Sequence, residues 1–271
     1  MPETQPTALA AAGLDRVAAR VAVWGTACLR GHVSPDLAAE RITAGSLPQR
    51  VWPVEGAGDD GVGRDGDPWT VVLARWSTGG VRGLRLALPA PGDVAGVPGP
   101  AAVVRAATQA GAAVIPLGGP PAVLVPEAGR AQIHWRVLPA EPPPLAATGL
   151  PEAERALREV LREAADALAS LEVARWSDGG GEVVAALRAG ALDGEALPAP
   201  YPPRARQALA QARRLRAVCA TALADDGGAV GRSDSTERRT VLRDLERAAR
   251  LTEMAACNAL LDPTAHDPLP R

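Results

Sequence analysis

The chain has 271 residues, a formal net charge of −2 and a pI near 6.0, and all 29 of its basic residues are Arg because it contains no Lys. The lack of Lys excludes the usual forms of Walker A loops, Schiff-base enzymes, PLP enzymes and protein kinases. The near-neutral charge argues against a general nucleic-acid binder, whose domains usually have a pI above about 9.

Residues with GC-rich codons dominate the composition, and Phe is absent as well as Lys. We therefore expect a protein from a high-GC bacterium, an actinobacterium in particular, and we read no function into the Arg excess. No basic N-terminal region precedes an apolar segment, and no uninterrupted apolar run approaches 18 residues. These features predict a soluble, cytoplasmic protein.

The N-terminal segment predicts two helices. Residues 7–30 carry apolar side chains at helical spacing, and Gly31 is placed to end that helix. A second, short helix is predicted from Pro35 to Ala44, with Ser34 as its N-cap. Residues 50–55 form a short extended piece, and the polar sequence at 56–68 predicts a loop.

Residues 69–88 form two alternating apolar runs around Thr78, Gly79 and Gly80, which predicts a β-hairpin. A helix over 101–110 and strands over 112–117, 122–125 and 131–138 follow. Because proline cannot donate to a strand ladder, the prolines of these strands predict that they are short or lie at sheet edges. Residues 1–138 therefore read as an α+β module with a small, mostly antiparallel sheet.

The proline-rich sequence at 139–151 predicts a semi-rigid linker, and residues 152–261 read as an all-α helical module. Its predicted helices cover 152–176, a short piece near 182–189, 204–223 and 236–261. Asp234 and Glu237 suggest a capping box at the start of the last helix, and the last two helices are expected to pair antiparallel. Residues 262–271 are predicted to be a flexible tail. The helix at 7–30 packs either on the sheet or in a bundle with the C-terminal helices.

Motifs for catalysis and metal binding are mostly missing. A G-x-G-x-x-G match at 56–61 lacks a following helix and contains two Asp, and neither H-E-x-x-H nor G-x-S-x-G occurs. The three Cys are widely separated and fall in helical patterns, which indicates small core residues in a reducing compartment. We expect no catalytic residue, no metal and no cofactor.

Basic side chains on the predicted sheet suggest an anion site. In the predicted hairpin, Arg75 and Arg82 share one face near the turn, while Arg85 lies on the other face, alongside His134 and Arg136 of the later strand. The alternative is that these residues line the wet face of a half-buried sheet. A second basic region is the last helical pair, where eleven Arg against seven acidic residues give a net charge of +4 over 204–253.

Two functions fit these observations. The first is a non-enzymatic binding protein whose helical half forms an interaction or self-association surface, with a protein partner or a second copy of the chain. The alternative is a sensor or enzyme that binds a small anionic ligand on the α+β module. Neither a membrane nor a nucleic acid is expected as a partner.

Overall fold

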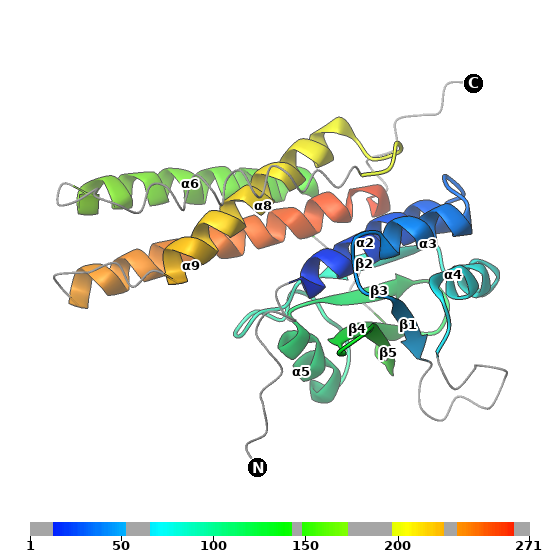
Figure 1. Ribbon diagram of the computed structural model, residues 1–271. Coiled ribbons are helices and arrows are strands. Elements are labelled where there is room, and N and C mark those ends of the chain that lie inside the picture. The colour runs from blue at the N-terminus through cyan, green and yellow to red at the C-terminus, as the bar shows by residue number, and fades with distance from the viewer. Residues whose placement is uncertain (1–12, 53–65, 143–147, 173–196, 225–231, 263–271) are drawn as a thin grey trace, which may run out of the picture. The chain divides into compact units, whose positions relative to one another are not determined.

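A computed structural model describes residues 13–52, 66–142, 148–172, 197–224 and 232–262 (Figure 1). The chain divides into two compact units. The first, the sheet unit, consists of residues 1–147 with 197–200 and 260–271, and the second, the helical unit, consists of residues 148–196 and 201–259. The predictions for residues 7–12, for most of the 56–68 loop, for the short helix near 182–189 and for the tail beyond 262 lie outside the described residues.

The sheet unit contains five strands in the order β1-β5-β4-β3-β2. β1 pairs parallel with β5, and all other neighbours are antiparallel, so the sheet is mixed. The strands are β1 Gln49–Trp52, β2 Gly83–Ala87, β3 Ala113–Leu117, β4 Ala122–Ala128 and β5 Ile133–Pro139. The helices are α2 Leu14–Leu29, α3 Pro35–Thr43, α4 Trp69–Thr78 and α5 Ala101–Ala110.

Helices cover both faces of the sheet (Figure 1). On one face α2 packs on β2 and β3, and Gly25 allows the close approach because a Cβ there would meet Leu84 Cδ1 at 2.3 Å. On the other face α5 packs on β4 through a buried cluster of Ala87, Val97, Val103, Ala107, Ala113, Ile115, Val123 and Val125. The sequence left open whether the first helix packs on the sheet or in a bundle with the C-terminal helices, and the structure shows that α2 packs on the sheet.

The local signals at two predicted helices are confirmed. The hydroxyl of Ser34 accepts a hydrogen bond from the amide of Leu37 at the start of α3, and Pro35 occupies the first helical position. Gly111 ends α5 in the left-handed region with φ of +68°. Local sequence therefore determines these ends independently of the tertiary contacts.

Residues 69–88 do not form the predicted hairpin. They form helix α4, followed by β2, which pairs with β3 instead. The prediction is wrong because the same residues also have helical spacing. Trp69, Val72 and Leu73 are buried, whereas Val71, which a strand would place on the same face as Trp69 and Leu73, is 42% exposed. Gly79 caps the helix instead of turning a hairpin.

The proline-containing strands lie inside the sheet and not at its edges. Pro116 in β3 and Pro126 in β4 have no N–H to donate, and the strands β3 and β4 pair at one position only, Val114 with Leu124. By contrast, β4 and β5 pair along seven positions. The prolines therefore shorten one ladder without moving the strands to an edge.

Buried polar side chains tie the sheet to its helices. Gln49 on β1 accepts hydrogen bonds from the indole N–H groups of Trp69 at 3.0 Å and Trp135 at 2.9 Å, and its amide donates to the carbonyl of Ile42 and the hydroxyl of Ser46, both at 3.0 Å. The side-chain amide of Gln49 thus makes all four of its hydrogen bonds, three of them in the buried core and one to the half-buried Ser46.

The outer edge of β2 is also covered. The hydroxyl of Thr26 on α2 accepts from the amide of Leu84 at 2.9 Å and lies 3.1 Å from its carbonyl, to which it donates. A strand edge without such partners offers its backbone groups to other chains. At Leu84, the hydroxyl of Thr26 occupies both backbone groups, so they are not available to pair with another strand.

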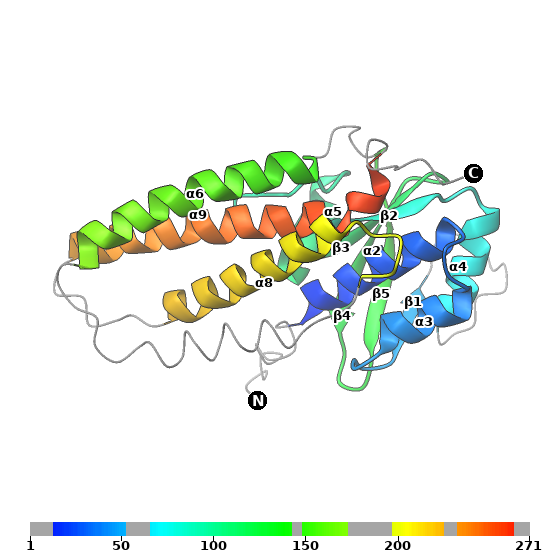
Figure 2. The same ribbon diagram turned by 90° about the horizontal axis from the view of Figure 1, so that it is seen from above.

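The helical unit contains α6 Leu150–Glu172, α8 Pro203–Ala224 and α9 Arg232–Cys257. α9 packs against both α6 and α8 and lies between them (Figure 2). Their core is formed by Leu157, Ala164, Cys219, Leu242, Leu245 and Ala249. Because α9 begins at Arg232, Asp234 lies within the helix and is not its N-cap, so the capping-box prediction is wrong. No helix in the described ranges is long and apolar enough to cross a membrane.

Candidate functional site

The five residues predicted as an anion site lie in three regions of the sheet unit. Arg75 is on α4 and forms an ion pair with Asp67 at 2.9 Å. Arg82 is exposed in the connection to β2, and its backbone amide donates to Leu117. With α4 helical, the shared hairpin face that was expected to bring these two side chains together does not exist.

Arg85, His134 and Arg136 share one face of the sheet according to the strand register, but they are not neighbours. Arg85 is on β2 and the other two are on β5, three strands away, which corresponds to roughly 14 Å. The apolar cluster beneath α5 occupies the strands between them. Partial burial lowers the pKa of the Arg85 guanidinium, which stays charged at neutral pH.

The two β5 residues have partners within the sheet unit. The ring of His134 stacks on Trp52 with centroids 4.4 Å apart, and Arg136 forms an ion pair with Glu127 at 2.6 Å. The five side chains therefore do not form one cluster, and anion binding by any of them stays a prediction.

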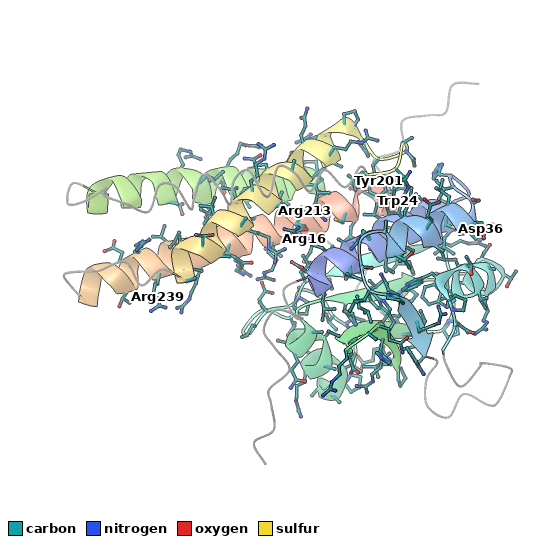
Figure 3. All side chains as sticks on the ribbon, viewed as in Figure 1. Arg16, Trp24, Asp36, Tyr201, Arg213 and Arg239 are labelled. Atoms are coloured by element: carbon teal, nitrogen blue, oxygen red, sulfur yellow. The ribbon has the colours of Figure 1, made fainter. Side chains whose placement is uncertain are left out.

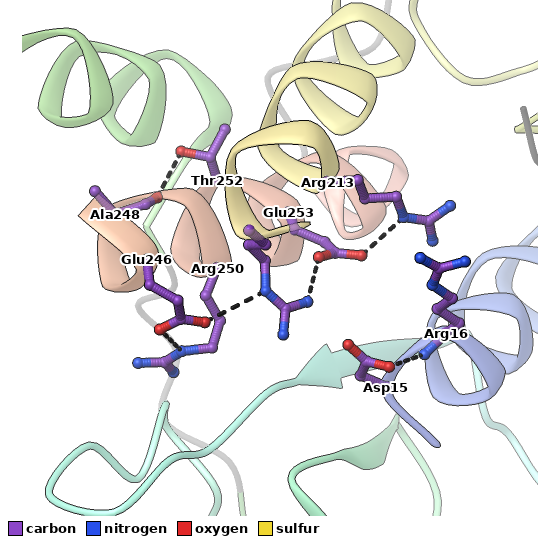
Figure 4. A network of polar contacts seen from close by, with 9 residues as sticks. Asp15, Arg16, Arg213, Glu246, Ala248, Arg250, Thr252 and Glu253 are labelled. Atoms are coloured by element: carbon purple, nitrogen blue, oxygen red, sulfur yellow. Dashed lines mark hydrogen bonds and ion pairs between the residues drawn. The ribbon is translucent and has the colours of Figure 1, made fainter. Parts of the chain in front are cut away.

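The densest arrangement of charged groups lies between α8 and α9 of the helical unit (Figure 4). Glu253 is 1% exposed, and its carboxylate accepts from Arg213 at 2.9 Å and from Arg216 at 2.5 Å. Glu246 accepts from Arg216 at 3.4 Å and from Arg250 at 3.5 Å. We call these five residues the ion network.

The ion network fixes how α8 and α9 pair. Removing one partner of a buried ion pair typically costs about 3–5 kcal/mol, because the other charge is then left in a poorly solvated place. The pairs Arg213–Glu253 and Arg216–Glu246 run in opposite chain directions, as an antiparallel helix pair requires. Any shift of one helix along the other would separate these partners.

Two of the three cysteines, Cys28 and Cys219, have raised pKa values. Burial, together with the nearby charge of Glu246, raises the pKa of Cys219 to about 11, and burial also raises the pKa of Cys28. Cys257 is buried, and its carbonyl accepts from the hydroxyl of Tyr201 at 3.0 Å. All three are free thiols, and their surroundings favour the protonated form over the reactive thiolate at Cys28 and Cys219.

Metal-binding clusters and apolar surface patches are also missing from the parts of the chain that the structure describes. No group of three or more His, Cys, Asp or Glu side chains there is arranged to hold a metal ion. The exposed large hydrophobic side chains there are Leu47, Val71 and Val94, all in the sheet unit. Among the residues of the helical unit whose side chains the structure describes, in 148–164, 201–224 and 236–259, no large hydrophobic side chain is exposed.

Several exposed Arg side chains lie along α9. Arg239, Arg243 and Arg247 are all exposed and recur every four residues, and Figure 3 labels Arg239 on this helix. The sequence indicated a basic helical pair but not the division of its Arg between an internal network and an outer row. The available signal was that Glu246 and Glu253, seven residues apart, border the apolar stripe of α9.

Two family models match the chain. Residues 18–150 match the N-terminal domain of the Rv1486c-like protein, and residues 151–254 match the C-terminal domain of the Rv1486c-like protein. No curated protein and no solved structure matches the chain.

Proposed function

The chain belongs to the Rv1486c-like protein family, and we propose that it works as a binding protein, which engages a protein partner through its helical unit and catalyses no reaction. The observation that carries the proposal is the ion network between α8 and α9. It directs two carboxylates inward and leaves a largely basic surface on the same pair of helices.

The chemistry of the described residues supports binding over catalysis. The carboxylates of the ion network are engaged by Arg side chains, and the thiols of Cys28 and Cys219 have raised pKa values. A general base or nucleophile instead needs a pKa that keeps a useful fraction of the group in its reactive, deprotonated form at neutral pH. A structural role for the network fits both observations.

The test places photo-crosslinking residues in the full chain within cells of the source organism. One set replaces exposed residues of the helical unit, Arg158 on α6, Gln211 on α8 and Arg243 on α9; the control set replaces Asp36 on α3 and Gln109 on α5, which are exposed in the sheet unit. We expect one discrete crosslinked partner from the helical set and none from the controls. Crosslinks from α3 and α5 alone, or from neither set, would contradict the proposal.

A further inference from the structure

Residues 89–100 connect β2 to α5 through two consecutive turns, and we call them the double-turn loop. In the first turn, Ala90 and Asp93 exchange two backbone hydrogen bonds, of 2.8 and 2.9 Å. In the second, the amide of Val97 donates to the carbonyl of Val94 at 3.0 Å. Val97 is buried in the apolar cluster beneath α5, so this turn is anchored on the sheet. Backbone hydrogen bonds and packing therefore hold the loop in one conformation.

One residue of the double-turn loop has a strained backbone. Among the residues that the structure describes, Ala95 is the only one other than glycine with a positive φ, of +50°. The left-handed region is unfavourable for a residue with a Cβ, whereas glycine occupies it without that cost. The carboxylate of Asp93 stabilises this conformation, because it accepts from the amide of Ala95 at 3.1 Å. Strained residues that their surroundings hold in place are typical of functional sites.

The double-turn loop presents an apolar tip to solvent. Val94 is 50% exposed, the largest exposed fraction of any large hydrophobic side chain in the described ranges, and Pro91 is exposed in the first turn. Asp93 is the only charged residue of the loop, although charged residues make up 22% of the chain. Apolar surface with few charges is typical of the core of a protein interface. A loop already held in one conformation also loses less entropy when it binds.

A protein with a small apolar pocket matches this tip better than a membrane or a nucleic acid does. Segments that bind membrane surfaces combine Trp, Phe or Leu with Lys or Arg. The double-turn loop contains none of these residue types, and its single charge is negative. Nucleic-acid phosphates likewise find no cation in the loop. The short, branched side chain of Val94 fits a pocket in a protein surface.

We propose that the double-turn loop is a second protein-binding surface, at which Val94 enters a small apolar pocket of a partner protein. Asp93 and Ala95 are positioning residues, since they fix the turn that carries Val94. The inference goes beyond the proposed function, because the loop belongs to the sheet unit and the proposed function concerns the helical unit.

The test places a photo-crosslinking residue at Pro91 of the full chain, within cells of the source organism, and combines it with second substitutions. Val94→Ser removes the apolar tip, and Val94→Trp keeps it apolar but makes it too large for a small pocket. The matched control is Val71→Ser, the same change at a Val of α4 that is 42% exposed. Circular dichroism and thermal unfolding verify that each variant is folded.

We expect one discrete crosslinked protein, whose yield falls about fivefold or more with Val94→Ser, because the apolar contact is lost. Val94→Trp should lower the yield by about as much, because a well-packed pocket does not accept a larger side chain. Val71→Ser should change it by less than about twofold. No crosslinked protein, or equal losses with Val94→Ser and Val71→Ser, would overturn the inference.

Val94→Trp also separates a protein pocket from general apolar adhesion. A higher crosslinking yield with Trp, or sedimentation of the purified chain with phosphatidylglycerol vesicles that increases with Trp, would show a membrane-binding or non-specific tip and overturn the inference. The crosslinks from α6, α8 and α9 test the proposed function separately. If they persist while Pro91 gives none, the inference fails and the proposed function stands.

Discussion

Replacing Gln49 with Leu should strongly destabilise the sheet unit. Gln49 is 2% exposed, and the substitution leaves three buried groups without their partner, namely the indole N–H groups of Trp69 and Trp135 and the carbonyl of Ile42. A buried polar group left unsatisfied costs about 1–3 kcal/mol. With the lower half of that range, about 1–2 kcal/mol, for each of the three groups, the loss is about 3–6 kcal/mol, a large part of the stability of an ordinary domain.

Urea unfolding of the full chain, followed by Trp fluorescence, measures this loss. Five of the six Trp residues lie in the sheet unit, so the signal reports chiefly on that unit. The control is Gln109→Leu, the same substitution at an exposed position of α5, which should change the free energy of unfolding by no more than about 0.5 kcal/mol.

A double variant separates the hydrogen bonds from the lost volume. Trp69→Phe in the Gln49→Leu background removes one of the stranded indole N–H groups, so its cost should be smaller there than in the wild-type background by about 1 kcal/mol. A loss below about 1 kcal/mol for Gln49→Leu, or an equal loss for Gln109→Leu, would refute the reasoning.

Three further predictions concern single groups. Thr26→Val should cost about 1–2 kcal/mol in urea unfolding because it strands the amide of Leu84, whereas Thr26→Ser, which keeps the hydroxyl, should cost less; equal losses would contradict the role of the hydroxyl. Glu253→Ala removes the carboxylate bound by Arg213 and should lower the stability of the helical unit by about 3 kcal/mol, measured by thermal unfolding at 222 nm, and a neutral effect would show that the network does not fix the helix pair. Because the folded-state pKa of Cys219 is raised from about 9 to about 11, the unfolded chain loses this proton first, so stability is fully present below pH 9 and falls as pH rises toward 11; Cys219→Ala should lack this decline, and an unchanged pH profile would contradict it.

Local signals predicted much of the sheet unit correctly. The Ser34 cap, the Pro35 start and the Gly111 stop act within one helical turn, so the sequence alone determines where α3 begins and where α5 ends. The strand at 131–138 was equally readable, because Ile133 and Trp135 alternate with residues that lie on the other face.

The failure at residues 69–78 has a physical cause. The segment is rich in β-branched and aromatic residues, which favour strands, but its apolar positions also satisfy helical spacing. Tertiary contacts decide between the two: Trp69 places its indole against Gln49 and Trp135 from the helical conformation. Those partners come from β1 and β5, which no local pattern connects to α4.

The partners in the ion network could not be predicted from the sequence, because they too depend on contacts between distant segments. The sequence predicted that α8 and α9 pair antiparallel. The ion pairs set the register of that pair, which places Cys219 close enough to Glu246 for that charge to raise its pKa. The small and Leu residues along both stripes are compatible with several registers. The charged pairs select one of them, and their partners cannot be identified until the register is known.

The short ladder between β3 and β4 has a consequence for how the sheet opens. Amides at the centre of a sheet usually exchange with solvent most slowly, because they are released only when the whole domain unfolds. Here Pro116 and Pro126 lie on the central strands, and the one paired position between those strands leaves side-chain packing to hold the two parts of the sheet together. We therefore expect the sheet to open locally between β3 and β4, with β2 and β3 on one side and β4, β5 and β1 on the other. Backbone amides between β3 and β4 should exchange with solvent faster than those between β4 and β5, where the ladder is continuous.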